Sequence, residues 1–205
     1  MTVHLVIPGL LGPLPETDIP GKLASFPLLK RCLARADQSP WTMDSQRTLF
    51  NLLNIGAEGD KDLPVAAISL LGETGDIPEG WWIHADPVTL KADGDRLLLF
   101  DAQGLDIQRD EMQALAAAFN DHFGCDGLRL YTVAPDRWYI TATTAPDVQT
   151  SLLTDVVGRN IDPWLPQGQE ASRWRQIINE VQMLFFNHPV NAAREAIGQP
   201  TIGGL

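Results

Sequence analysis

The 205-residue sequence has few cysteines and few basic residues. Its two cysteines, Cys32 and Cys125, have no CxxC or metal-ligand spacing, so we expect two buried thiols in a reducing cytoplasm rather than disulfides. Lys and Arg number 15 against 26 Asp and Glu, and the net charge of −11 argues against nucleic acid or anionic lipid as a partner. The same charge repels phosphate ligands, so an anion site would need a local group of arginines.

Long apolar runs and the common catalytic motifs are also absent. No window approaches the ~20 apolar residues of a membrane span, and Pro8 and Gly9 interrupt the N-terminal apolar run, so we expect neither a span nor a signal peptide. There is no GxSxG, HExxH or Walker A motif, and Pro13 and Pro15 do not suit a phosphate-binding helix N-terminus. The four histidines are scattered, so no metal ion and no cofactor are expected. Together these features predict a soluble, cytoplasmic protein.

The first 80 residues read as the start of an α/β domain. Residues 3–7 form a short apolar run that predicts a buried strand, and residues 9–24 are rich in Pro and Gly and predict a loop. Ser25 and Asp44 are placed to cap two helices, the second with Leu49, Leu52 and Leu53 facing inward. The apolar run 65–71 fits either a strand or a short buried helix.

The pattern changes after residue 80. Strand-like runs at 81–90 and 96–101 flank a hairpin signal, a helix follows from about Gln108 to Phe123, and two more strands meet at a turn over 134–136. This order predicts an α+β (ββαββ) unit within residues 81–168. Residues 169–205 are helical, because apolar side chains recur at helical spacing from Trp174 to Phe185. We therefore predict three parts: 1–80, 81–168 and 169–205.

Two polar segments stand out as candidate sites. His84 and Asp86 lie two residues apart in a strand-like run, which places them on one face as a metal pair, an acid/base pair or a local hydrogen bond at the strand's end. In the segment 187–195, His188, Asn191 and Arg194 form either a capping cluster or an anion site. Two further arginines are candidate ligands that a structural contact explains equally well: Arg137 and Arg159.

Several segments, in order along the chain, resemble the archaeal-type cofactor-independent phosphoglycerate mutases of the alkaline phosphatase superfamily. The resembling segments are FPLLKRCLARA, PVAAISLLGE, WWIHADPVTL, GLDIQRDEMQALAAAFND and NHPVN..RE..GQP. A closer resemblance is to a bacterial family with W..ADPVHL and HPVN..RE motifs, whose members are described as phosphoglycerate mutases or as regulatory proteins. In this chain Thr89 replaces the second His of the first motif.

The resemblance implies a partial alkaline-phosphatase-like sheet into which the α+β unit is inserted. The mutases carry a metal-binding Asp directly after the first strand, where this chain reads Ile7-Pro8-Gly9-Leu10. They carry a nucleophilic Ser followed by Asp where this chain has Leu63-Pro64. We therefore expect no mutase activity and a non-catalytic protein that acts in regulation or binding.

Two other functions stay open at this stage. The first is an enzyme in which His84, Asp86, Arg159 and Arg194 converge on a phosphorylated or carboxylated small molecule. The second is a structural interaction module. The apolar, Gly-rich residues 196–205 predict either an unpaired strand that docks on a protein partner or on a second copy of the chain, or a frayed tail.

Overall fold

The computed structural model describes residues 26–35, 45–54, 62–76 and 79–205, and the chain divides into two compact units, Met1–Asp60 and Lys61–Leu205. The strand expected over 3–7, the loop over 9–24 and the caps at Ser25 and Asp44 lie outside the described residues. The architecture is mixed α/β, with helices and antiparallel sheets.

The first unit contains helices α2 (Pro27–Arg35) and α3 (Ser45–Leu52), at the two places where helices are predicted. The expected inward face of the second helix is wrong, because Leu49, Leu52 and Leu53 are exposed and Phe50 is the buried side chain. One residue along a helix turns the side chain by about 100°, so a one-residue error moves the predicted stripe away from the buried face.

The prediction of buried thiols is also wrong. Cys32 lies in α2 and Cys125 lies in η1 (Gly124–Asp126), a 3₁₀ turn, and both thiols are free and exposed. Beside Cys125 the core position is taken by a larger apolar side chain, since Phe123 is buried two residues earlier.

The second unit begins with helix α4 (Val65–Thr74), which resolves the ambiguity over 65–71 in favour of a helix. Pro64 precedes its first turn, and Gly75 ends it in the left-handed conformation with φ of 80°. Ala66 and Leu70, four residues apart on one side of the helix, are its buried positions.

A three-stranded antiparallel sheet forms the centre of this unit. Its order is β1 (Trp81–His84), β5 (Arg137–Ala142) and β4 (Leu128–Ala134). Strands β4 and β5 are joined by the tight turn predicted over 134–136.

A separate two-stranded hairpin pairs β2 (Thr89–Asp93) with β3 (Arg96–Phe100). The expectation of a single strand over 81–90 is therefore wrong: the run splits at Asp86-Pro87 into β1 and β2, which belong to different sheets. The cause is local, since Pro87 has no N–H to donate to a ladder. Three strands rather than two precede the helix, and the unit is βββαββ rather than ββαββ.

Helix α5 (Arg109–Phe123) follows the hairpin and agrees closely with its predicted range. Its first turn closes a capping box in which Glu111 accepts from the backbone N–H of Gln108 at 2.8 Å. Its predicted inner side chains are buried: Met112, Leu115, Phe119 and Phe123.

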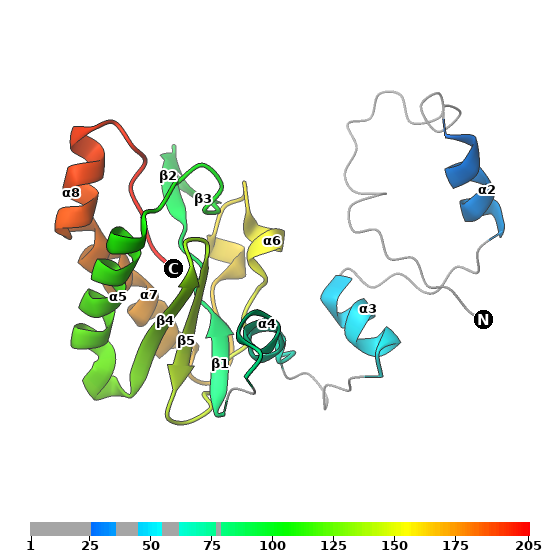
Figure 1. Ribbon diagram of the computed structural model, residues 1–205, viewed down its shortest axis with the longest axis horizontal. Helices are drawn as coiled ribbons and strands as arrows, with labels where there is room; N and C mark the ends of the chain where they lie inside the picture. Colours follow the sequence, from blue (N-terminus) through cyan, green and yellow to red (C-terminus); the bar gives the residue numbers. More distant parts are fainter. Residues whose placement is uncertain (1–25, 36–44, 55–61, 77–78) are drawn as a thin grey trace. The chain divides into compact units, whose positions relative to one another are not determined.

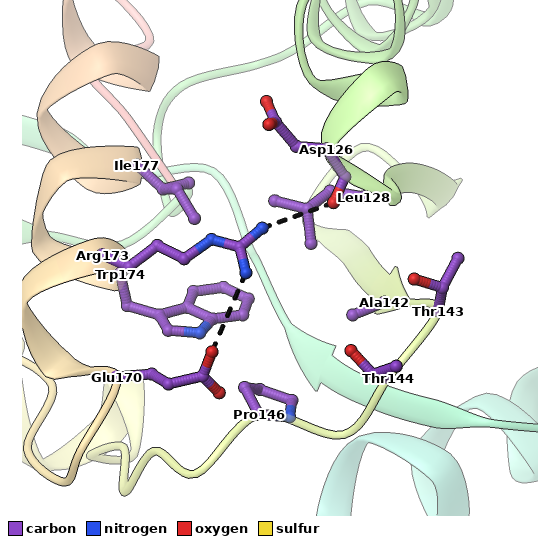
Figure 2. Close-up of a pocket in the computed structure, with 10 residues that line it drawn as sticks. All are labelled: Asp126, Leu128, Ala142, Thr143, Thr144, Pro146, Glu170, Arg173, Trp174 and Ile177. Atoms are coloured by element: carbon purple, nitrogen blue, oxygen red, sulfur yellow. Dashed lines mark hydrogen bonds and ion pairs between the residues drawn. The ribbon is translucent and has the colours of Figure 1, made fainter.

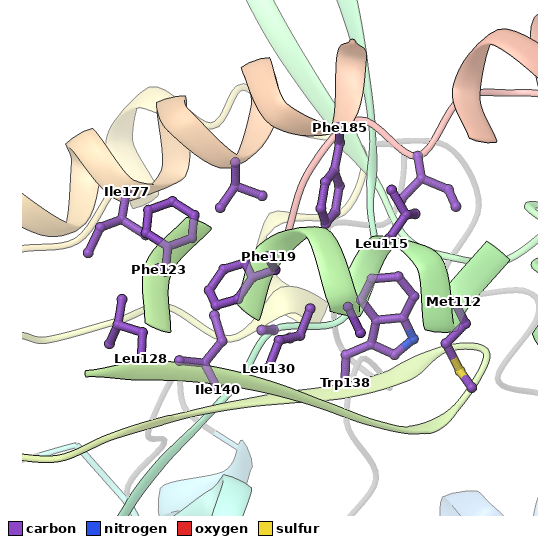
Figure 3. Close-up of a cluster of buried hydrophobic side chains, with 14 of the residues drawn as sticks. Met112, Leu115, Phe119, Phe123, Leu128, Leu130, Trp138, Ile140, Ile177 and Phe185 are labelled. Atoms are coloured by element: carbon purple, nitrogen blue, oxygen red, sulfur yellow. The ribbon is translucent and has the colours of Figure 1, made fainter. Parts of the chain in front are cut away.

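The remaining elements are α6 (Leu153–Val156), η2 (Asp162–Trp164), α7 (Ala171–Phe186) and α8 (Pro189–Ala196). Figure 1 shows α5, α7 and α8 on one side of strands β4 and β5, with α4 beside β1. Figure 3 shows the core between the sheet's inner face and helices α5 and α7. Residues of the ranges 81–168 and 169–205 share this core, in which the buried side chains of α7 are Trp174, Ile177, Val181 and Phe185.

Candidate functional site

Polar side chains collect on the outer face of the β1–β5–β4 sheet, the face turned away from the core. His84 ends β1 and lies opposite Tyr139 of β5 in the strand register. Arg137 points to the same face as Tyr139, because residues two apart in a strand share a face. Asp86 follows β1, and Glu73 is in the last turn of α4. We call these five residues the outer cluster.

Ion pairs and hydrogen bonds join the outer cluster. The Arg137 Nε lies 3.0 Å from Glu73 Oε1, and its Nη1 lies 3.7 Å from Asp86 Oδ2. Asp86 also accepts from the backbone N–H of Trp138 at 2.9 Å, which anchors the end of β1 to β5. The Tyr139 hydroxyl donates to Glu73 Oε2 at 2.8 Å. The cluster therefore fastens α4 to the sheet.

Burial differs within the outer cluster. Tyr139 is fully buried, and burial, reinforced by its hydrogen bond to the Glu73 carboxylate, raises the pKa of its hydroxyl far above the ordinary value. The His84 ring lies 4.8 Å from the Tyr139 ring. Its Nδ1 is buried 3.5 Å from Asp86 Oδ2 and makes no hydrogen bond with the described residues. The Arg137 side chain is 40% exposed and is the member most accessible to a ligand.

The second predicted segment builds the end of the chain. Pro189 takes the first position of α8, and the His188 Nδ1 accepts from the backbone N–H of Val190 at 3.2 Å as the helix cap. Beyond the helix, Gly198 has φ of 73°, the left-handed conformation typical of a helix end, and Pro200 follows.

Asn191 and Arg194 project from α8 into the protein, each only 1% exposed. The Asn191 Nδ2 donates to the carbonyls of Phe185 and Ile202 at 2.8 Å each, and its Oδ1 accepts from the N–H of Ile202 at 2.8 Å. Asn191 thus satisfies both backbone polar groups of Ile202, in the way that a neighbouring strand would.

The Arg194 guanidinium binds three separate elements. Its Nε donates to the carbonyl of Pro200 at 2.7 Å, its Nη1 to Glu111 Oε2 at 2.7 Å, and its Nη2 to the carbonyl of Leu105. We call Asn191, Arg194, Glu111 and residues 200–204 the C-terminal cluster. These hydrogen bonds occupy all three guanidinium nitrogens of Arg194. They favour a structural role for residues 187–195 over an anion site.

The C-terminal residues are packed within the chain, so the expectation of an unpaired docking strand at 196–205 is wrong. Ile202 is fully buried, and Gly204 forms an antiparallel bridge with Val88 next to the start of β2. A Cβ on Gly203 would come within 3.1 Å of the Leu90 backbone nitrogen, which explains glycine at this close approach. Two side chains bond to the backbone of this segment. Asn191 donates to the carbonyl of Ile202, and the Thr89 hydroxyl donates to the carbonyl of Thr201 at 2.9 Å.

Residues 200–204 bond to Val88 and Thr89 on one side and to Asn191 and Arg194 on the other, but no described hydrogen bond or ion pair joins His84 to His188. Of the seven predicted site residues, His84, Asp86 and Arg137 come together, Asn191 and Arg194 form a second group, and His188 caps the helix that carries the second group. Arg159 belongs to neither: it is exposed, its guanidinium lies 5.6 Å from the Trp164 ring, and its carbonyl accepts from the N–H of Leu99. The prediction missed Glu73 and Tyr139, although the alternation from Arg137 to Tyr139 could have indicated the second.

A small pocket lies at the other end of the sheet (Figure 2). Arg173 crosses it, pairing with Glu170 at 3.8 Å and donating to the carbonyl of Asp126 at 3.4 Å. Its volume of about 30 Å³ is room for only a few water molecules. Within the described part of the chain, no group of three or more His, Cys, Asp or Glu side chains could hold a metal ion.

Among the described elements of the second unit, α4 covers the outer face of the sheet on the β1 side. Strand alternation turns Arg129 and Tyr131 of β4 outward, and Val133, which lies at an irregularity in the β4–β5 register, is also exposed. We call these three residues the open strip. Tyr131 is 46% exposed and Val133 is 39% exposed, and the Tyr131 ring also contacts Trp82 of β1 at 5.2 Å between ring centroids. The alternation in LRLYTV predicts two faces but not which one stays uncovered.

The free edge of β4 is blocked by a side chain of α5. The Asn120 Oδ1 accepts from the N–H of Leu130 at 2.7 Å, and its Nδ2 donates to the Leu130 carbonyl at 3.1 Å. A bidentate amide of this kind takes both backbone groups that another strand would need, and so protects the edge from strand addition.

No protein-family model matches the chain, and no curated protein sequence or solved structure matches it significantly. The resemblance to the phosphoglycerate mutases stays a prediction. Among the helices that the structure describes, none is long and apolar enough to cross a membrane.

Proposed function

We propose that this chain is a non-catalytic, phosphoglycerate-mutase-like protein of the cytoplasm that acts in regulation by binding a protein partner through the open strip. The observation that carries the proposal is the exposure of Tyr131 and Val133, at 46% and 39%, on a sheet face that α4 leaves partly uncovered. Exposed tyrosines are common anchors of protein interfaces, because a large amphipathic ring buries much area at low entropic cost.

The state of the polar side chains supports binding over catalysis. Asp86 and Glu73 are engaged with Arg137 and with groups of β5, and the guanidinium of Arg194 has three internal partners. The pocket beside Arg173 is far below the several hundred Å³ of a typical small-molecule site. The finer fold assignment, an incomplete alkaline-phosphatase-like sheet with an inserted α+β unit, belongs to the same proposal and rests on the sequence resemblance alone.

One observation favours a second candidate, a site for a small phosphorylated or carboxylated molecule. Arg137 is 40% exposed, and the Nδ1 of the adjacent His84 lacks a hydrogen bond. Titration with inorganic phosphate and with 3-phosphoglycerate, followed by backbone NMR shifts, tests this candidate. Saturable shifts confined to the two residues and abolished in Arg137→Ala would favour it over partner binding.

In-cell photocrosslinking tests the partner-binding proposal. A photoreactive benzoylphenylalanine replaces Tyr131 in one version of the protein and Gln103, an exposed position outside the open strip, in the control version. We expect a discrete crosslinked protein from position 131 only, and we expect the purified partner to bind the unmodified chain at least about tenfold more tightly than Val133→Asp. Equal crosslinking from both positions, or unchanged affinity in Val133→Asp, would refute the proposal.

A coupled mutase assay with added manganese tests the non-catalytic part. Turnover well above that of buffer would show that the chain is an enzyme.

A further inference from the structure

The outer cluster holds a buried histidine nitrogen without a hydrogen bond, next to an arginine whose donors are only partly used. We propose that His84 is a proton-operated switch for an anion site at Arg137. When the His84 ring takes up a proton, it draws Asp86 away from Arg137, and the released guanidinium binds a small oxyanion, a carboxylate or phosphate group. The inference rests on the second candidate of the proposed function and adds its regulation. It does not depend on partner binding at the open strip.

The Asp86 carboxylate lies beside both basic side chains. Its Oδ1 accepts from the backbone N–H of Trp138 at 2.9 Å, which holds the carboxylate in place. Its Oδ2 lies 3.5 Å from the His84 Nδ1 and 3.7 Å from the Arg137 Nη1. A charge-assisted hydrogen bond is shorter, at about 2.7–2.9 Å, so Oδ2 is fully bonded to neither nitrogen. A movement of less than about 1 Å is enough to bond it to one of them.

The state of the His84 ring decides which nitrogen Asp86 takes. Histidine is the side chain that commonly changes charge between about pH 5 and 8. The His84 Nδ1 is buried and has no hydrogen bond with the described residues. A proton on both ring nitrogens turns Nδ1 into a charged donor that faces the carboxylate of Asp86. The Asp86 Oδ2 then bonds to His84, and its ion pair with Arg137 is lost.

The charges around His84 set the direction of the switch. The titratable and charged groups around the ring are Asp86 after β1, Arg137 and Tyr139 of β5, and Glu73 of α4. Tyr139 is neutral, because burial raises the pKa of its hydroxyl. While His84 is neutral, two carboxylates outweigh one guanidinium, and this local charge adds to the net charge of −11 in repelling an anion. A proton on His84 balances the local charge, so the anion binds to the protonated form.

Arg137 has donors that an anion can use. Its Nε lies 3.0 Å from Glu73 Oε1, and this pair holds the guanidinium in place. Among the described residues, Nη1 has only the 3.7 Å approach to Asp86, and Nη2 has no partner. The two Nη groups form a fork that binds a carboxylate or a phosphate with two hydrogen bonds. Because the side chain is 40% exposed, a ligand can reach this fork once Asp86 is released.

Sulfate binding to the full chain tests the inference, because the charge of sulfate does not change near neutral pH. The side-chain NMR signals of His84 and Arg137 are followed during sulfate titration at constant ionic strength, at about pH 5.5 and at about pH 8. We expect saturable shifts of both side chains, with a dissociation constant at least about tenfold lower at the lower pH. No binding at either pH would remove the site, and equal affinity at both would remove the switch.

Two histidine variants separate the switch from a general effect of charge. We expect His84→Gln to bind sulfate weakly at both pH values. The matched control is His122→Gln, which changes an exposed histidine paired with Glu180 and should keep the pH dependence of wild type. Arg137→Gln should abolish binding. Equal pH dependence in the two histidine variants would show that His84 is not the switch.

The wild-type protein gives a second readout if His84→Gln does not fold. Protonated His84 should show an Nδ1–H signal that exchanges slowly with water, because this proton is buried and bonded to Asp86. A rapidly exchanging Nδ1–H at the lower pH would overturn the switch. These failures are distinct from failure of the proposed function. Crosslinking at position 131 tests partner binding, and sulfate binding without pH dependence would keep the anion site of the second candidate.

Discussion

The outer cluster and the C-terminal cluster are built from the same kinds of side chain but lie in opposite surroundings. Each centres on an arginine held by a carboxylate. Arg194 is 1% exposed and bonds to Glu111 and to two backbone carbonyls. The Arg137 side chain is 40% exposed and pairs with the carboxylates of Glu73 and Asp86. Burial is what separates a structural arginine from an accessible one. A buried guanidinium must have every donor satisfied, whereas a half-exposed one can exchange partners with water.

Removing residues 201–205 is expected to destabilise the C-terminal cluster more than any other change. The deletion takes away the fully buried Ile202 and the bridge from Gly204 to Val88, and it leaves Asn191 without its main partners. Loss of the isoleucine contacts costs about 2–5 kcal/mol, and the unsatisfied amide adds about 1–3 kcal/mol. We expect urea unfolding to show a free energy of unfolding reduced by the sum of these, or no folded state.

If the truncated protein does not fold, the milder variant Ile202→Ala still allows the free energy of unfolding to be measured. We expect a loss of about 2–5 kcal/mol for it, with the backbone bonds to Asn191 retained. Unchanged stability in both variants would mean that the tail is frayed in solution.

Arg194→Met is the next largest change. Removing one partner of a buried ion pair costs about 3–5 kcal/mol, because Glu111 loses its cation and the carbonyls of Leu105 and Pro200 lose the donors that Arg194 supplies. The matched control is Arg173→Met, whose guanidinium is 53% exposed and pairs with Glu170, so that its loss costs less than about 1 kcal/mol. Similar costs for the two variants, measured by urea unfolding, would contradict the distinction drawn from burial.

The positions of α5 and α7 could be predicted, because each follows from short-range pattern. The inner positions of α5 recur at helical spacing, and the buried stripe from Trp174 to Phe185 is continuous. The split of 81–90 between two sheets could not be predicted with the same rules. Asp86-Pro87 signals a break, but the partner of each half, β5 in one case and β3 in the other, depends on segments far along the chain.

The candidate site was predictable to a similar extent. His84 and Asp86 could be paired from their spacing alone, whereas Glu73 comes from a helix and Arg137 from a strand more than 60 residues later. The sequence marked 187–195 as unusual, and capping rules account for His188 and Pro189. Nothing in that segment indicates Glu111 or the carbonyl of Leu105 as partners of Arg194, since those contacts need the packed fold.

Tyr139→Phe should change the pH dependence of stability, with a smaller effect at neutral pH. Loss of the hydrogen bond to Glu73 costs about 1 kcal/mol at pH 7. In the folded wild type, burial raises the pKa of the Tyr139 hydroxyl, so the folded state stays protonated while the unfolded state ionises near pH 10. The stabilisation is therefore complete below about pH 10 and is lost as the pH rises above it, by at most about 1.4 kcal/mol per pH unit.

Urea unfolding between pH 8 and 11.5 measures this difference. Wild type should lose stability more steeply above pH 10 than Tyr139→Phe does. Tyr131→Phe, which alters an exposed tyrosine of the neighbouring strand, serves as the control and should follow wild type. Parallel curves for wild type and Tyr139→Phe would show that the hydroxyl of Tyr139 is not held protonated by the fold.

Arg137→Ala is expected to have the smallest effect on stability and separates the two clusters most clearly. The Arg137 side chain is half-exposed and solvent screens its charge, so the loss of its two ion pairs should cost less than about 1 kcal/mol. Asp86 keeps the N–H of Trp138, and Glu73 keeps the hydroxyl of Tyr139. At 1 M salt, where the screening length is about 3 Å, the difference from wild type should shrink further, whereas the cost of Arg194→Met should persist. If Arg137→Ala lowers the free energy of unfolding as much as Arg194→Met does, and salt does not change this loss, the outer cluster contributes as much to stability as the C-terminal cluster.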